Sequence, residues 1–115
     1  MPKYVALVTY TTEAWAKILE HGQNREEAVK QTVERAGGKL DSVHWTMSHY
    51  DGIVFFEVPD AQTAMAFSAI VGASGTFSHF ELHPVFSADE HAEIVAKARG
   101  LTFYGHKHPE TPRHN

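Results

Sequence analysis

Residues 53–58 read Ile-Val-Phe-Phe-Glu-Val, a run that is apolar at almost every position. Successive side chains of a strand point to opposite sides of a sheet, so this run predicts a strand that is covered on both faces and lies in the centre of the sheet. Residues 3–10, Lys-Tyr-Val-Ala-Leu-Val-Thr-Tyr, have the same character and predict a second central strand. These two stretches decide the fold, because any other strand has to lie outside them.

Two further stretches alternate between polar and apolar side chains, as edge strands do. In residues 40–47, Val43 and Trp45 share one face, and His44 lies on the other. This strand forms a hairpin with residues 53–58. Residues 76–86 form the last expected strand, which also has a polar face.

Helices are expected between these strands. Their boundaries follow from capping residues and glycines. The four expected helices are a short one around Trp15 that ends at His21-Gly22-Gln23, a main one from the Asn24 cap to Gly37-Gly38, one from Asp60 to Gly72, and one from the Ser87–Glu90 capping box to Gly100. The resulting order is the split βαβ pattern of a ferredoxin-like α+β fold, an antiparallel four-stranded sheet with an extra C-terminal helix.

One face of the predicted sheet has no helix to cover it. We expect Tyr4, Val8, Phe55 and their neighbours to leave apolar surface on this open face. A second subunit would cover that surface, so the sequence predicts a homo-oligomer in which sheet faces pack together. The size of the oligomer, a dimer or larger, stays open.

Length and composition limit the class of protein. A chain of 115 residues fits a single core, and we assign residues 1–100 to one domain and 101–115 to a polar tail. The absence of cysteine excludes disulfides and thiolate chemistry, and a net charge of −4 argues against nucleic acid as a partner. No segment is apolar enough for a membrane, and no export signal is apparent, so we expect a soluble cytoplasmic protein.

The sequence resembles the GYD domain family over roughly residues 2–99. The resemblance rests on Tyr4-Val5-Ala6-Leu7, Arg25, Gly37-Gly38-Lys39, Tyr50-Asp51 with the apolar strand and Pro59-Asp60 after it, Gly75, and the junction from Phe86-Ser87 to Glu90. Ser48 or His49 stands where the family name has its glycine. The resemblance implies a fold of the dimeric α/β-barrel kind that assembles into homo-oligomers. It implies no single activity, because this fold hosts haem enzymes, cofactor-free monooxygenases and ligand-sensing domains.

The last strand contains the sharpest candidate site. His79, Glu81 and His83 alternate with core residues and therefore share one face. Neighbours two apart are about 6.5 to 7 Å apart along the strand, so Glu81 with either histidine is close enough to chelate one ion, whereas His79 with His83 is too far apart. In the family pattern, small hydroxylated residues are commoner at positions 79 and 81, so a site here would belong to a subgroup.

His44 is expected on the same open face, at the opposite edge of the sheet from His79. A partner subunit would bring the two together. A set of histidines and a carboxylate with open positions suits zinc, iron, manganese or nickel. The tail residues His106, His108 and His114 form a looser histidine-rich stretch, for which the simpler interpretation is a flexible terminus.

Two other interpretations of the cluster stay open. These side chains are either solvated or interface groups, or they form a metal-free acid–base set of His44, His79 or Glu81. Tyr10 and Tyr50 are expected to border the same cavity as ligand-binding residues. Asp51 is expected to accept hydrogen bonds from backbone amides of its turn.

We therefore expect a homo-oligomeric protein that binds a small ligand in a cavity on the open sheet face, with or without a divalent metal. One alternative is a small oxygenase- or isomerase-like enzyme in that cavity. The other is an effector-sensing module without turnover.

Overall fold

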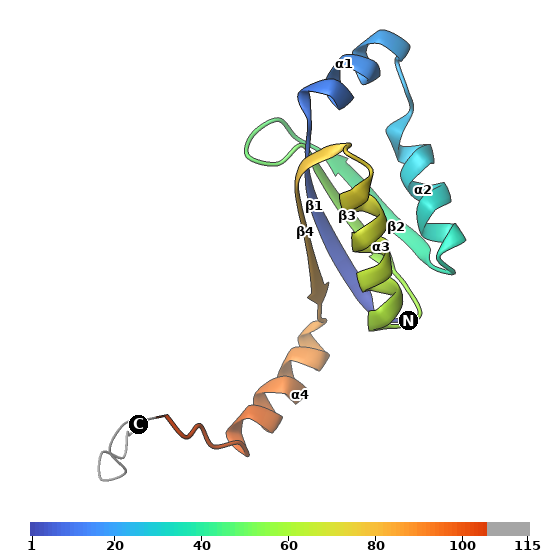
Figure 1. Cartoon of the computed structure of the whole chain (residues 1–115). Helices are drawn as coiled ribbons and strands as arrows, with labels where there is room; N and C mark the ends of the chain where they lie inside the picture. Colours follow the sequence, from blue (N-terminus) through green and yellow to red (C-terminus); the bar gives the residue numbers. More distant parts are fainter. Residues whose placement is uncertain (106–115) are drawn as a thin grey trace. The chain divides into compact units, whose positions relative to one another are not determined.

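The computed structural model describes residues 1–105, so the predictions for His106, His108 and His114 fall outside the described residues. The elements are β1 Lys3–Tyr10, α1 Thr12–His21, α2 Arg25–Arg35, β2 Lys39–Trp45, β3 Gly52–Glu57, α3 Ala61–Ala73, β4 Phe77–Val85 and α4 Ala88–Arg99 (Figure 1). The chain divides into two compact units, Met1–Val85 and a second that begins at Phe86.

All four strands form one antiparallel sheet in the order β2-β3-β1-β4. The two strands that are apolar on both faces, β1 and β3, are central, as the sequence predicted. This order is that of the ferredoxin-like α+β fold. β2 ends at Trp45, two residues earlier than expected, because the chain turns there and the Thr46 amide donates to the Asp51 carbonyl at 2.8 Å.

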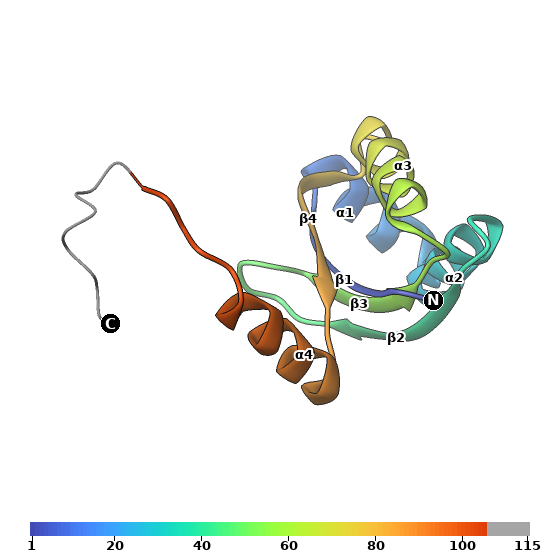
Figure 2. The same ribbon diagram turned by 90° about the horizontal axis from the view of Figure 1, so that it is seen from below.

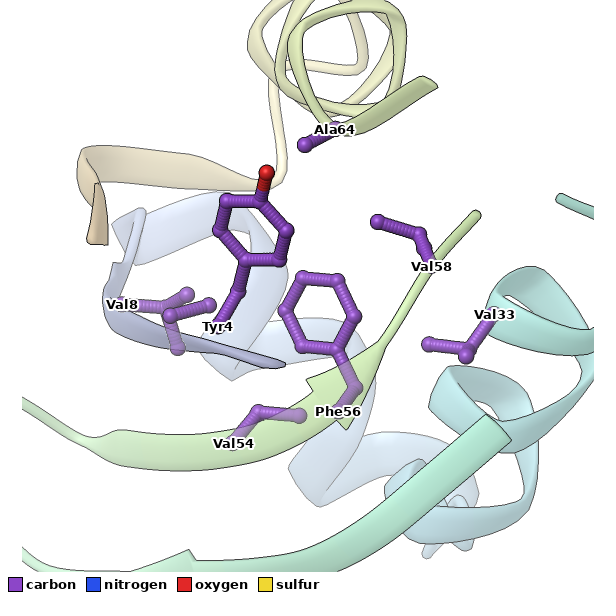
Figure 3. Packing of buried hydrophobic residues seen from close by; sticks show 8 residues of the cluster. Tyr4, Val8, Val33, Val54, Phe56, Val58 and Ala64 are labelled. Carbon is purple, nitrogen blue, oxygen red and sulfur yellow. The ribbon is translucent and has the colours of Figure 1, made fainter. Parts of the chain in front are cut away.

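Helices α2 and α3 cover one face of the sheet (Figure 2). The core lies between them and the sheet, where Phe56 and Val58 meet Val33 of α2 and Ala64 of α3 (Figure 3). Phe56, Val33 and Val58 are fully buried. The apolar stripe of α2 and the small residues of α3 thus pack against the sheet, as their helical spacing predicted.

The two faces of β1 are the reverse of what the sequence predicted. Tyr4 and Val8 are buried on the helix-covered face, so the prediction that they leave apolar surface on the open face is wrong. The open face instead carries Val5 and Leu7, which lie opposite Phe55 and Ile53 of β3. A strand that is apolar on both faces does not indicate which face the helices will cover. Phe55, 36% exposed, does lie on the open face as predicted.

Capping follows the sequence with one exception. Asn24 and Asp60 accept the hydrogen bonds of Glu27 N–H and Thr63 N–H, at 3.2 and 2.8 Å. The reciprocal capping box is complete at Ser87 and Glu90 of α4, whereas at Asn24 only the first of its two bonds is present. Across residues 1–105, no helix has the length and apolar character needed to cross a membrane.

Candidate functional site

The open face of β4 carries a compact polar cluster around Glu81. His79, Glu81 and His83 face the same side, opposite Thr9, Leu7 and Val5 of β1 in the register. His79 Nε2 lies 2.7 Å from Glu81 Oε2, and His83 Nε2 lies 3.0 Å from Glu81 Oε1. The two histidines are too far apart along the strand to hold one ion. Both of their side chains instead contact the carboxylate of Glu81, one from each side.

Tyr50 joins this cluster from the loop between β2 and β3. Its hydroxyl donates to Glu81 Oε2 at 2.5 Å, so the carboxylate is shared by three side chains from two segments. His49 lies beside it, with ring centroids 4.6 Å from Tyr50 and 6.0 Å from His79. His49 is not among the site residues predicted from the sequence, and its position next to Tyr50 in the loop is the signal that could have included it.

Asp51 holds the loop that presents Tyr50. Its buried carboxylate accepts from the Tyr10 backbone N–H at 3.0 Å and from the Trp15 indole at 3.3 Å. These donors belong to β1 and α1, whereas the prediction had placed them in the turn itself. The Asp51 N–H in turn donates to the Val8 carbonyl at 2.7 Å. Asp51 therefore attaches the loop to the end of β1, and Tyr50 reaches Glu81 as a result.

The three hydrogen bonds make Glu81 a persistent anion. Those from His83, Tyr50 and His79, in that order of effect, lower the pKa of Glu81 to about 2. The same contact raises the pKa of the Tyr50 hydroxyl, since the neighbouring carboxylate disfavours a phenolate. At neutral pH the cluster contains a carboxylate that accepts and a phenol that donates.

This arrangement fixes which nitrogen of each imidazole carries a hydrogen. An ionised carboxylate only accepts, so both Nε2 atoms must donate, and when the rings are neutral their Nδ1 atoms are acceptors. A histidine oriented by a carboxylate in this way serves either as a general base or as a metal ligand through its other nitrogen. Glu81 is thus placed as the group that orients His79 and His83.

The remaining predicted residues lie elsewhere. His44 is on the open face, with its ring 6.5 Å from that of Phe55, but β3 and β1 separate it from β4. Three strand spacings amount to about 14 Å. His44 therefore cannot join the Glu81 cluster within one subunit, as the sequence analysis anticipated.

Tyr10 lies on the other side of the sheet. It is buried against Trp15 and Phe77, at ring-centroid distances of 5.3 Å each, and burial raises the pKa of its hydroxyl. The prediction that it borders the same cavity as Tyr50 is wrong. The reason is again the orientation of β1, because its even-numbered residues face the helices.

No preformed metal centre accompanies the cluster. Among residues 1–105, no group of three or more histidine, aspartate or glutamate side chains is arranged to hold an ion. The cluster is a hydrogen-bonded network in which the carboxylate oxygens already have partners.

Comparison with known proteins agrees with the fold. The sequence matches the GYD domain over residues 4–95. The chain is similar in structure to 30S ribosomal protein S6 from Thermotoga maritima, with a TM-score of 0.54, 16% identity, and coverage of 85% of this chain and 97% of that one. A hypothetical protein from Pyrococcus horikoshii has a TM-score of 0.49 and 12% identity, covering 79% and 96% of the two chains. At 16% identity the likeness to protein S6 concerns the fold alone. No curated protein sequence matches the chain.

Proposed function

The chain belongs to the GYD domain family, and from this premise we propose that it is a homo-oligomeric protein that binds a small ligand at the Tyr50–Glu81 cluster on its open sheet face. The observation that carries the proposal is the carboxylate of Glu81, which three side chains hold ionised beside the apolar residues Leu7 and Val5 of the open face. A solvated surface carboxylate has no need of three protein donors. A binding site does, because they fix its position before the ligand arrives.

A second copy of the chain supplies the cover in this proposal. Val5 and Leu7 of β1 lie opposite Phe55 and Ile53 of β3, so their side chains form one continuous apolar strip in the middle of the open face. A two-fold interface places such a strip against its own copy. The Glu81 cluster, on the edge strand β4, then borders the interface, where water is partly excluded and polar contacts gain strength.

The chemistry of the cluster indicates the kind of ligand. It offers a remaining acceptor position on Glu81 Oε1, which has His83 as its one partner among the described residues, and further acceptors on the Nδ1 atoms of His79 and His83. A small, partly apolar molecule with hydrogen-bond donors fits these groups. Its apolar part would contact Leu7 and Val5 of β1, which lie opposite Glu81 and His83 in the register. The carboxylate–histidine pairs also suit a proton transfer, so turnover of the ligand is one possible outcome of the test.

A thermal-shift screen of small metabolites on three proteins tests this proposal. The three are wild type, Glu81→Gln and the control Glu57→Gln, which changes another glutamate on the same face that lies 3.9 Å from Lys3. A ligand at 100 times its Kd stabilises the folded state by about 2.7 kcal/mol, which corresponds to several degrees in Tm. We expect at least one compound to raise the Tm of wild type and Glu57→Gln but not that of Glu81→Gln.

The outcomes separate the alternatives. Mass spectrometry of each stabilising compound after incubation distinguishes an enzyme, which changes it, from a sensing module, which does not. If every stabilising compound acts equally on Glu81→Gln, or if none stabilises the wild type, the open-face site is wrong.

A divalent metal is a second candidate ligand. The observation that favours it is the carboxylate behind two histidines, an arrangement that commonly orients histidine ligands of a metal. Because His79 and His83 are too far apart to hold one ion together, the Nδ1 atom of one of them and His44 of a second copy would be the ligands in this candidate. Elemental analysis of untagged protein that has never touched a metal column tests this candidate. A near-stoichiometric transition metal that is lost in His79→Ala supports it, and a value near zero contradicts it.

A further inference from the structure

A cavity of about 100 Å³ lies on the helix-covered face of the sheet, beneath α2 and α3 and apart from the Glu81 cluster. Its lining is apolar except near Arg25, Tyr10 and Thr32. The apolar residues that matter here come from the sheet and both helices, namely Val8, Val54, Val29, Phe67, Phe77 and Phe80. An apolar cavity of comparable size, about 150 Å³, is enough to bind benzene. At about two thirds of that volume, this cavity has room for a short alkyl chain or for part of a ring whose remainder extends into the adjoining space.

Arg25 brings a positive charge to this apolar space. Among residues 1–105, Arg25 is the one charged residue that lines the cavity. Its Nε is buried and has no hydrogen-bond partner, and its Cζ lies 5.9 Å from the Tyr10 ring centroid. Among the described residues, its guanidinium donates to the Gln23 side chain at 3.3 Å, and its contact with the Tyr10 hydroxyl partly counteracts the rise in the pKa of that hydroxyl. A buried donor without a partner is costly, and a ligand that accepts from it would remove that cost.

The cavity adjoins a wider cleft and shares lining residues with it. Tyr10, Arg25 and Trp45 line both the cavity and a cleft of about 540 Å³ that also includes Trp15. Two carboxylates line the cleft. Asp51 is occupied by the Tyr10 amide and the Trp15 indole, and Glu26 is exposed at the start of α2. In residues 1–105, no ion pair joins Arg25 to either of them.

We propose that this cavity binds a small monocarboxylic acid whose apolar body fills the space beneath α2 and α3 and whose carboxylate pairs with Arg25. A carboxylate accepts two parallel hydrogen bonds from a guanidinium, one of them from Nε. A neutral apolar molecule would leave Nε unpaired, and a cation would be repelled. The site is independent of the Glu81 cluster, because it lies on the opposite face of the sheet.

Tryptophan fluorescence reports on this site directly, since both tryptophans of the chain, Trp15 and Trp45, line the cleft. We would titrate the protein with phenylacetate and, as a matched neutral probe, with phenylacetamide. The variant is Arg25→Gln. The control is Arg35→Gln, which removes the same charge from the exposed far end of the same helix.

We expect phenylacetate to change the fluorescence of wild type and Arg35→Gln with similar affinity. In Arg25→Gln its binding should be weaker by a factor of about 10 or more, the usual effect of losing a charge-assisted hydrogen bond. Phenylacetamide should bind wild type about 10-fold or more weakly than phenylacetate. Circular dichroism of each variant checks that the fold is retained.

Three results would overturn the proposal: no saturable change with phenylacetate, equal affinity for the acid and the amide, or unchanged affinity in Arg25→Gln. Glu81→Gln separates this proposal from the one for the open face. It should bind phenylacetate as wild type does, and a loss of binding in that variant would place the acid at the open face instead.

Discussion

At the scale of residues, Tyr50 is expected to control the charge of Glu81. Tyr50→Phe removes one of the three hydrogen bonds that lower the pKa of this carboxylate, so that pKa should rise from about 2 toward its ordinary value of 4.5. The side-chain carboxyl signal of Glu81, followed by NMR across an acid titration, measures it. Asp60, whose pKa is lowered by the Thr63 amide at the start of α3, serves as an internal control and should titrate alike in both proteins.

The sign of the pH dependence follows from the lowered pKa. Glu81 stabilises the folded state fully above its ordinary pKa of 4.5, and this contribution is lost as the pH falls toward about 2. In Tyr50→Phe the loss should begin at the same pH but end at a higher pH, so the total loss of stability on acidification should be smaller than in wild type. An unchanged midpoint for Glu81 in Tyr50→Phe would mean that the phenol does not hold the carboxylate in solution.

How far the sequence predicts this site depends on the distance over which each contact acts. Strand alternation is local, so it placed His79, Glu81 and His83 on one face correctly. It could not choose the face for Tyr10, because β1 is apolar on both sides and only packing against α2 and α3 decides. The contact of Tyr50 with Glu81 spans 31 residues and depends on how Asp51 anchors a loop. Periodicity carries no information about such a contact.

At the scale of elements, the turn from α2 into β2 depends on Gly38. A Cβ at this position would overlap the backbone carbonyl oxygen of Glu57 and press on Val58 and Val33, both fully buried. Backbone cannot yield as a flexible side chain can. Gly38→Ala should therefore destabilise the fold by about 2 kcal/mol or more, in the upper part of the range for overpacked cores, as measured by urea denaturation.

Gly72 provides the matched control in α3. A Cβ there meets nothing within 4 Å, and a helical glycine is less favourable than alanine by about 0.5 to 1 kcal/mol. Gly72→Ala should therefore raise the stability by about that amount. Equal effects of the two substitutions would contradict the close packing of the α2–β2 turn against β3. The sequence predicted the helix end at Gly37-Gly38, but the approach of Gly38 to a distant strand became apparent only in the folded chain.

At the scale of the whole molecule, the open sheet face is the surface through which we propose that copies of the chain associate. The sequence argument for an oligomer relied on apolar side chains on both faces of β1 and β3. That argument still holds after the two faces of β1 are exchanged. Val5, Leu7 and Ile53, and not Tyr4 and Val8, are the apolar neighbours of Phe55 on the open face. The open face still carries an apolar strip, although two of its three named members, Tyr4 and Val8, were wrong.

Phe55→Glu tests this association. A charge in the middle of the strip would be buried without a partner in the interface, which is strongly unfavourable, whereas in a monomer the side chain at position 55 is 36% exposed and the charge can reach water. Light scattering over a dilution series should give wild type at least twice its mass of 12.8 kDa and Phe55→Glu the monomer mass.

Met65→Glu is the matched control, since Met65 is 66% exposed on α3, in the same unit but away from the open face. It should leave the mass of the wild-type oligomer unchanged. A monomeric wild type at all concentrations would contradict the oligomer and, with it, the cover proposed for the Glu81 cluster. The Arg25 cavity would be unaffected, because its lining belongs to a single copy. Loss of association in Phe55→Glu together with loss of ligand binding at Glu81 would instead establish that the site is completed by the second copy.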